Sequence, residues 1–99
     1  MEKRIWEGGA RMNDKVAKIF ELANFFNRDA VLAEVVKNDP EMDDMLYIDI
    51  DTSYNEWDGE RVARKTVERS FEISLYDDVR SNEEMNEAIE TLSFLCEVA

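Results

Sequence analysis

Two stretches in the middle of the chain alternate apolar and polar residues. Leu46, Ile48 and Ile50 occupy every second position of the first stretch, and apolar residues take most alternate positions between 67 and 75 in the second. This period of two is typical of a β-strand that is buried on one face. If the two strands pair antiparallel, one face of the sheet is apolar and the other gathers four acidic residues, Asp49, Asp51, Glu68 and Glu72.

The segment between these strands is charged and contains Asp58-Gly59, a dipeptide that favours a tight turn. Since two strands alone make a marginal sheet, a third short strand between Glu60 and Arg64 is one interpretation of this connector. Arg69 interrupts the apolar alternation of the second strand. Either a β-bulge shifts the register there, or the arginine stem packs at the edge of the core while its guanidinium reaches solvent.

Helical patterns lie on both sides of the strands. Asn13 is placed to cap a first helix whose apolar face consists of Val16, Ile19, Phe20, Ala23 and Phe26. After a break at 27–29, the stretch from Ala30 to Lys37 predicts a second short helix capped by Asp29, and one bent helix through both stretches is the alternative. Pro40 ends either helix, because proline disfavours helical geometry at the preceding residue.

The last part of the chain predicts an amphipathic helix. Ser81-Asn82-Glu83-Glu84 matches a capping box with Ser81 as the N-cap and Glu84 three residues later. The apolar stripe that follows consists of Met85, Ala88, Ile89, Leu92, Leu95 and Cys96.

Together these patterns predict a small single α+β domain. It has an N-terminal helix or helix pair, an antiparallel β-hairpin or three-stranded sheet, and a C-terminal helix packed on one face of the sheet. We expect residues 12–99 to form this compact domain. Residues 1–11 contain the breaker Gly8-Gly9 and are expected to be a disordered leader. Because the codons of Glu7-Gly8-Gly9 can spell a ribosome-binding sequence, translation is expected to begin at Met12.

The charge of the chain is strongly negative and unevenly placed. Twelve basic and twenty-four acidic residues give a net charge of −12, and residues 38–60 carry nine acids and no base. Such a surface repels nucleic acid and anionic membranes and attracts basic protein surfaces, although solubility is an alternative reason for acidity. The predicted second helix has only one base, Lys37, so the helix pair lacks the basic face of a helix-turn-helix DNA reader.

Few side chains suit catalysis or metal binding. The chain has no histidine, which removes the commonest general base and metal ligand, and its one cysteine, Cys96, falls on the apolar stripe of the last helix. The window from Asp49 to Glu60 has the acidic spacing of an EF-hand loop, but Tyr54 occupies the position that needs glycine. We therefore expect no enzymatic activity, no cofactor and no metal site.

The acidic strand face favours a protein-binding inhibitor. Suitably spaced carboxylates pair with the lysines and arginines that otherwise hold phosphates, so the domain would imitate nucleic acid and block the basic groove of a nucleic-acid-handling protein. Aromatic residues near the acids would anchor the contact. The residues expected to bind the partner are Asp43, Asp44, Tyr47, Asp49, Asp51, Tyr54, Glu56, Trp57, Asp58, Glu68 and Glu72.

In size and charge the chain resembles anti-defence proteins of phages and mobile elements, including anti-CRISPR and anti-restriction proteins, although no motif carries the likeness. An antitoxin or immunity protein that neutralises a basic toxin would present the same surface. A structural or regulatory interaction module is the third hypothesis, with Phe94 and Val98 seeding a homodimer. Since no apolar run is long enough to span a bilayer, a cytoplasmic location is expected.

Overall fold

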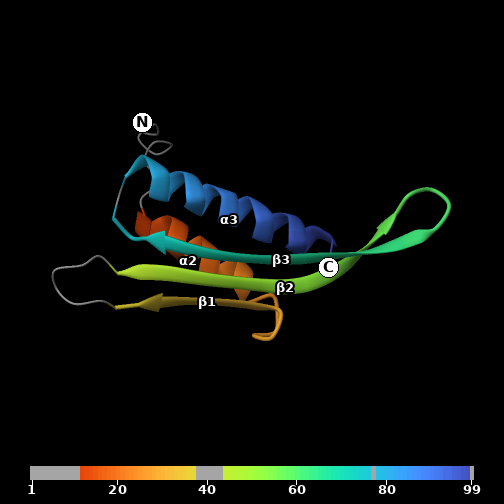
Figure 1. The fold of residues 1–99 in the computed structure, drawn as a ribbon, viewed down its shortest axis with the longest axis horizontal. Coiled ribbons are helices and arrows are strands. Elements are labelled where there is room, and N and C mark those ends of the chain that lie inside the picture. The colour runs from red at the N-terminus through yellow and green to blue at the C-terminus, as the bar shows by residue number, and fades with distance from the viewer. Residues whose placement is uncertain (1–11, 38–43, 77, 99) are drawn as a thin grey trace.

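The described part of the chain forms two layers, a three-stranded antiparallel sheet and two helices that cover one of its faces (Figure 1). The computed structural model describes residues 12–37, 44–76 and 78–98. In chain order the elements are α2 (Met12–Ala23), β1 (Val31–Val36), β2 (Met45–Trp57), β3 (Val62–Ser74) and α3 (Val79–Val98). The predicted α+β architecture is confirmed in its three-stranded form. Neither of the described helices has the length and apolarity needed to cross a membrane.

A long hairpin of β2 and β3 forms the centre and one edge of the sheet, and its far end reaches beyond the helices (Figure 1). Its register runs without interruption through all thirteen residues of each strand. The predicted turn at Asp58-Gly59 closes the hairpin, and Gly59 has a φ of +99°, a conformation that glycine adopts without strain. Both strands are longer than the alternation indicated. The prediction of a separate short strand between Glu60 and Arg64 is wrong, because these residues lead into β3, which begins at Val62.

The prediction of a second helix at Ala30–Lys37 is also wrong, because Val31–Val36 forms the edge strand β1. β1 pairs antiparallel with β2, with Val31 opposite Ile50. Three of its six residues are valines, whose branched side chains favour strands, and a helix this short gains little from its own hydrogen bonds. The chain therefore has one helix before the sheet in its described part, and neither the helix pair nor the bent helix forms.

Apolar side chains from alternate strand positions meet both helices in one core. Leu46, Ile48 and Ile50 of β2 are at most 2% exposed. The helices, β1 and β3 complete the buried apolar set with Ile19, Leu22, Ala23, Val31, Phe71, Ile73, Met85, Ala88, Leu92 and Leu95. The predicted stripe of α3 is confirmed, with Ile89 and Cys96 packed at its margin. Phe26 also packs on the core, but from the segment that follows α2.

Asp78, rather than Ser81, caps α3. The Ser81 backbone N–H donates a 2.8 Å hydrogen bond to the Asp78 carboxylate, which lowers the pKa of Asp78. Ser81 itself is buried within the first turn, because α3 begins at Val79. The capping box was therefore placed three residues too late. Asn13, the predicted cap of the first helix, likewise lies inside α2, which begins at Met12.

Arg69 keeps its place in the strand without a bulge, since the β2–β3 register is continuous through it. Its guanidinium carbon lies 4.5 Å from the centroid of the Phe71 ring, and its Nη2 donates a 2.6 Å hydrogen bond to Glu87 Oε2 on α3. Of the two alternatives for Arg69, the second is confirmed. Its stem lies at the edge of the core, and its charged end reaches an exposed glutamate.

Leu92→Ala tests the assignment of the core face of α3. Leu92 is fully buried, and truncation of such a side chain leaves a cavity that costs about 2–5 kcal/mol. We expect urea denaturation to show a loss of unfolding free energy of this size. The control Glu90→Ala changes an exposed position of the same helix and should alter stability by less than about 0.5 kcal/mol. Equal effects would contradict the assignment.

Asp78→Ala tests the cap and its pH dependence. The substitution leaves the Ser81 N–H without its carboxylate acceptor, so we expect a lower Tm at pH 7. Because the folded-state pKa of Asp78 is lowered, its stabilising contribution is present above the unfolded-state pKa, near about 3.9, and is lost as pH falls through the folded-state pKa. The Tm difference from wild type, followed by circular dichroism, should shrink in acid. A difference that stays constant down to pH 2 would rule out a contribution from the charge of the carboxylate.

Candidate functional site

The sheet face that α2 and α3 leave uncovered is the candidate functional site. The strand alternation that buries Ile48 and Ile50 directs their neighbours to this opposite face. Five exposed carboxylates gather there from all three strands, and we call this set the acidic face: Glu34, Asp49, Asp51, Glu68 and Glu72.

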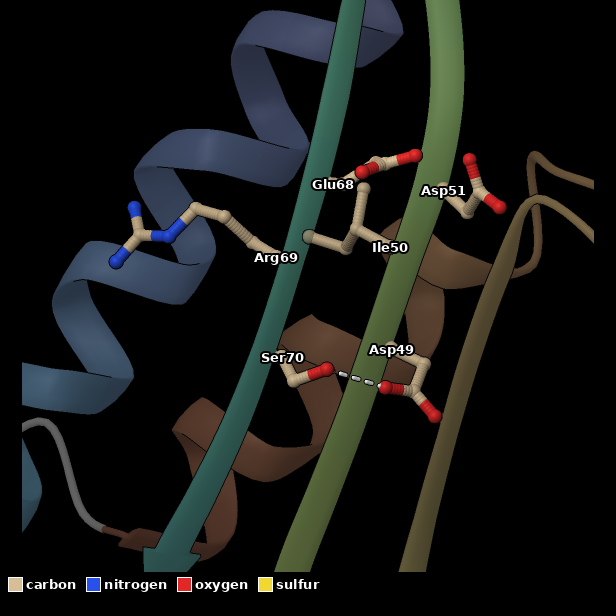
Figure 2. Close-up of a pocket in the computed structure, with 6 residues that line it drawn as sticks. All are labelled: Asp49, Ile50, Asp51, Glu68, Arg69 and Ser70. Atoms are coloured by element: carbon tan, nitrogen blue, oxygen red, sulfur yellow. Dashed lines mark hydrogen bonds between the residues drawn. The ribbon is translucent and has the colours of Figure 1, made fainter.

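Several members of the acidic face lie directly opposite one another or opposite a small polar residue. Asp49 faces Ser70, whose hydroxyl donates a 2.6 Å hydrogen bond to Asp49 Oδ1 (Figure 2). Asp51 faces Glu68. Directly opposed residues of an antiparallel pair have Cβ atoms about 4.5–5.5 Å apart, and like charges at such positions are destabilising. Repulsion between Asp51 and Glu68 therefore raises the free energy of the folded state.

An open hollow of about 430 Å³ runs along these two strands, lined by Asp49, Ile50, Asp51, Glu68, Arg69 and Ser70. Arg69 contributes no charge to the acids, because its side chain is directed toward α3, where it pairs with Glu87 (Figure 2). Within the described residues, no member of the acidic face makes an ion pair. Its negative charge is thus available to a basic molecule in solution.

The linear charge density of the acidic face is about two-thirds of that of duplex DNA. Glu34 and Glu72 flank Tyr47, and four residues further along β2 Asp51 faces Glu68. Four residues of strand span about 13 Å. Five carboxylates in this length give about one per 2.6 Å, compared with about one phosphate charge per 1.7 Å of duplex axis. A surface that binds phosphates would meet about two-thirds as many negative charges over the same length here.

Six of the eleven predicted binding residues share the alternation of this face: Tyr47, Asp49, Asp51, Trp57, Glu68 and Glu72. Tyr47 is half-buried at one end of the acidic face. Trp57 lies six residues beyond Asp51, about 20 Å along β2, and is 64% exposed near the hairpin turn. The face therefore combines an acidic centre with a distant aromatic side chain.

Two predicted residues belong to the helix-facing side of the hairpin. The Tyr54 ring packs edge-on against Phe94 of α3, with centroids 5.3 Å apart. Glu56 pairs with Lys65 across the hairpin at 3.7 Å. Asp43 lies outside the described residues. The alternation therefore separates Tyr54 and Glu56 from the acidic face.

Two further predicted acids serve the ends of the strands. The Asp58 carboxylate accepts hydrogen bonds from the backbone N–H groups of Arg61 and Glu60, each at 3.0 Å, and these bonds lower the pKa of Asp58. Asp44 lies just before β2 and pairs with Lys37 at 3.5 Å. These contacts give both acids a structural role in closing the turn and joining β1 to β2.

Sequence analysis missed Glu34, which joins the acidic face from β1. Its segment was predicted as a helix, and a helix would have placed it away from Asp49. The signal that could have found it is the valine content of Val31–Val36, which favours a strand. Ser70, which donates to Asp49, was not among the predicted site residues, although it shares the alternation of Glu68 and Glu72 on β3.

The acidic face offers ionic and hydrogen-bonding contacts. In the described ranges, no three His, Cys, Asp or Glu residues are arranged to hold a metal ion. The window from Asp49 to Glu60, which has the acidic spacing of an EF-hand loop, begins in the extended strand β2, so its acidic side chains do not converge on one point. The only cysteine, Cys96, is partly buried beside the Leu22 carbonyl, and burial raises the pKa of its thiol. Such a thiol is a poor nucleophile at neutral pH.

Comparison with known proteins gives no family for the chain. No protein-family model, curated protein or solved structure matches it. Function is therefore inferred from the acidic face itself.

Glu68→Gln tests the repulsion between Glu68 and Asp51. We expect the free energy of unfolding to rise by a few tenths of a kcal/mol at low salt, because a like-charge contact is removed. In 1 M salt the gain should disappear, because exposed charges are screened. Glu34→Gln removes the same charge from a position opposite Tyr47 and is the matched control. If urea denaturation shows that Glu68→Gln destabilises the protein, the two carboxylates do not repel.

Proposed function

We propose that the protein is a binding inhibitor whose acidic face occupies a basic protein surface that otherwise holds nucleic acid. The observation that carries this proposal is the set of five exposed carboxylates without ion-pair partners among the described residues. Lysine and arginine side chains that bind phosphates also pair with carboxylates, and arginine does so in two-pronged geometry. Occupation of the basic surface would exclude nucleic acid from it.

The placement of the acids suits rapid association. They lie on a broad sheet surface that neither described helix covers, so a partner reaches them without rearrangement of the core (Figure 1). The excess of negative charge over the whole chain adds a long-range attraction toward basic surfaces. Binding by such contacts is expected to weaken steeply as salt rises.

The end of the hairpin supplies an apolar contact to the same interface. Trp57 lies opposite Val62, and both side chains are more than half exposed. Large aromatic residues frequently carry a disproportionate share of binding energy when a partner buries them. A partner that spans about 20 Å would contact both the acidic face and this apolar pair.

The test compares three immobilised proteins for capture from a lysate of the native host. They are the wild type, the triple variant Asp49→Asn/Asp51→Asn/Glu68→Gln, and the charge-matched control Glu83→Gln/Glu90→Gln/Glu97→Gln on exposed positions of α3. Bound proteins are displaced with duplex DNA at constant ionic strength and identified by mass spectrometry. We expect wild type and control to release the same nucleic-acid-binding protein, and the triple variant to retain at least about tenfold less of it.

Two results would contradict the proposal. One is equal capture by the triple variant, which would remove the acidic face from the interface. The other is capture that duplex DNA does not displace, which would show that the partner surface is not a nucleic-acid site. The triple variant should be at least as stable as wild type, because it also removes the Asp51–Glu68 contact, so a loss of binding would not reflect unfolding.

A further inference from the structure

In the part of the chain that the structure describes, one edge of β1 is open and its outward backbone groups are not paired with another strand. The Ala30 carbonyl accepts from the Asp51 N–H, and the Val31 N–H turns the other way, to the Asn27 carbonyl. Since strand residues alternate in direction, Ala33 and Val35 direct their N–H and C=O groups away from β2. No described strand pairs with that side of β1. The edge is thus a template for one more strand.

The two edges of the sheet differ in composition. β3 carries five charged residues among thirteen: Arg64, Lys65, Glu68, Arg69 and Glu72. Two of these, Lys65 and Arg69, are at helix-facing positions, an arrangement that discourages another strand from pairing there. β1 carries one charge among six residues, Glu34. Strand addition is therefore favoured at β1.

A small hollow with both polar and apolar lining residues borders β1. It has a volume of about 180 Å³, and the residues that line it are Phe20, Ala23, Asn24, Phe26, Arg28, Val31, Leu32 and Ala33. Edge-addition sites commonly combine free backbone groups with a pocket for a side chain of the incoming strand. A small side chain directed to the helix side would fit this hollow.

We propose that the occupant of this edge is β1 of a second copy of the chain, paired antiparallel with Ala33 opposite Ala33. In this register the N–H and C=O of Ala33 pair with those of Ala33 in the second copy, and the Val35 N–H faces the Val31 carbonyl, while the Val31 N–H keeps its bond to the Asn27 carbonyl. Val35 of the second copy then lies opposite Val31, which is one of the residues that line the hollow. Leu32 faces Glu34 of the second copy, so like charges do not lie directly opposite each other.

The charge distribution favours a second copy at this place. Residues 12–37 carry four acids and four bases and are neutral, whereas the whole chain has a charge of −12. The four acids are Asp14, Glu21, Asp29 and Glu34, and the four bases are Lys15, Lys18, Arg28 and Lys37. Contact through β1 thus keeps the self-repelling surfaces of β2, β3 and α3 outside the interface. This inference is independent of the proposed function.

The test measures the mass of the full chain by sedimentation between 5 and 500 µM, with a reductant that keeps Cys96 from cross-linking. Ala33→Pro removes an edge-directed N–H of β1, and Thr66→Pro makes the matched change at the free edge of β3. We expect wild type and Thr66→Pro to rise from 11.6 kDa toward twice that mass, while Ala33→Pro stays monomeric. Amide exchange at Ala33 and Val35 should slow with concentration, while exchange at Thr66 should not.

A second pair of variants covers the case in which Ala33→Pro fails to fold. Ala33→Lys and Ala33→Glu each place like charges at the symmetry axis, so each alone should remain monomeric, and an equal mixture should restore a dimer. Wild type that stays monomeric at 500 µM overturns the proposal. So does a dimer that Thr66→Pro abolishes and Ala33→Pro leaves intact, or a mixture of the charged variants that does not associate.

Discussion

The period-two register between β2 and β3 is the constraint on which both the core and the acidic face depend. A shift of one residue would turn Ile48 and Ile50 toward solvent and bring Asp49 and Asp51 against the helices. Burial of an aliphatic side chain of this size contributes about 1.5–3 kcal/mol, whereas an unpaired carboxylate in the core costs several. The core therefore fixes the register, and the register places the acids on the uncovered side.

Stability alone does not account for the composition of that side. Asp51 faces Glu68 directly, and threonine or lysine at either position would suit a cross-strand pair better. Arg69, which could have neutralised them from the neighbouring position, faces the helix side and pairs with Glu87. The repulsion between these carboxylates acts on the uncovered face, whose side chains do not pack in the core. A basic partner would convert this repulsion into attraction, which gives the arrangement a physical reason.

The long elements were predictable because each has a sustained pattern, whereas β1 and the helix cap were not. The apolar residues of Val31–Val36 fit a helical or a strand spacing equally well over so few positions, and only pairing with β2 decides between them. Asp78 and Ser81 are both good capping residues, and the choice depends on where the chain turns after β3. Sequence analysis identified four of the five carboxylates of the acidic face, all except Glu34. The alternation that buries Ile48 also directs Tyr54 to the helix side. The sequence alone therefore indicated that Tyr54 does not belong to the acidic face, although it was predicted to bind the partner.

If the acidic face binds a basic partner as proposed, the neutrality of residues 12–37 and the acidity of the remainder address two opposing needs. A uniformly acidic surface would bind basic partners and repel its own copies. With β1 strands paired, both acidic faces would lie on the same side of one six-stranded sheet, their centres a little over three strand spacings, or about 16 Å, apart. A long basic groove that contacts both acidic faces would bind the dimer more tightly than a single copy, because the second contact is formed within the same complex. Its positive charge would also screen the repulsion between the two copies. Partner binding and self-association would then strengthen each other by the same factor, as thermodynamic linkage requires.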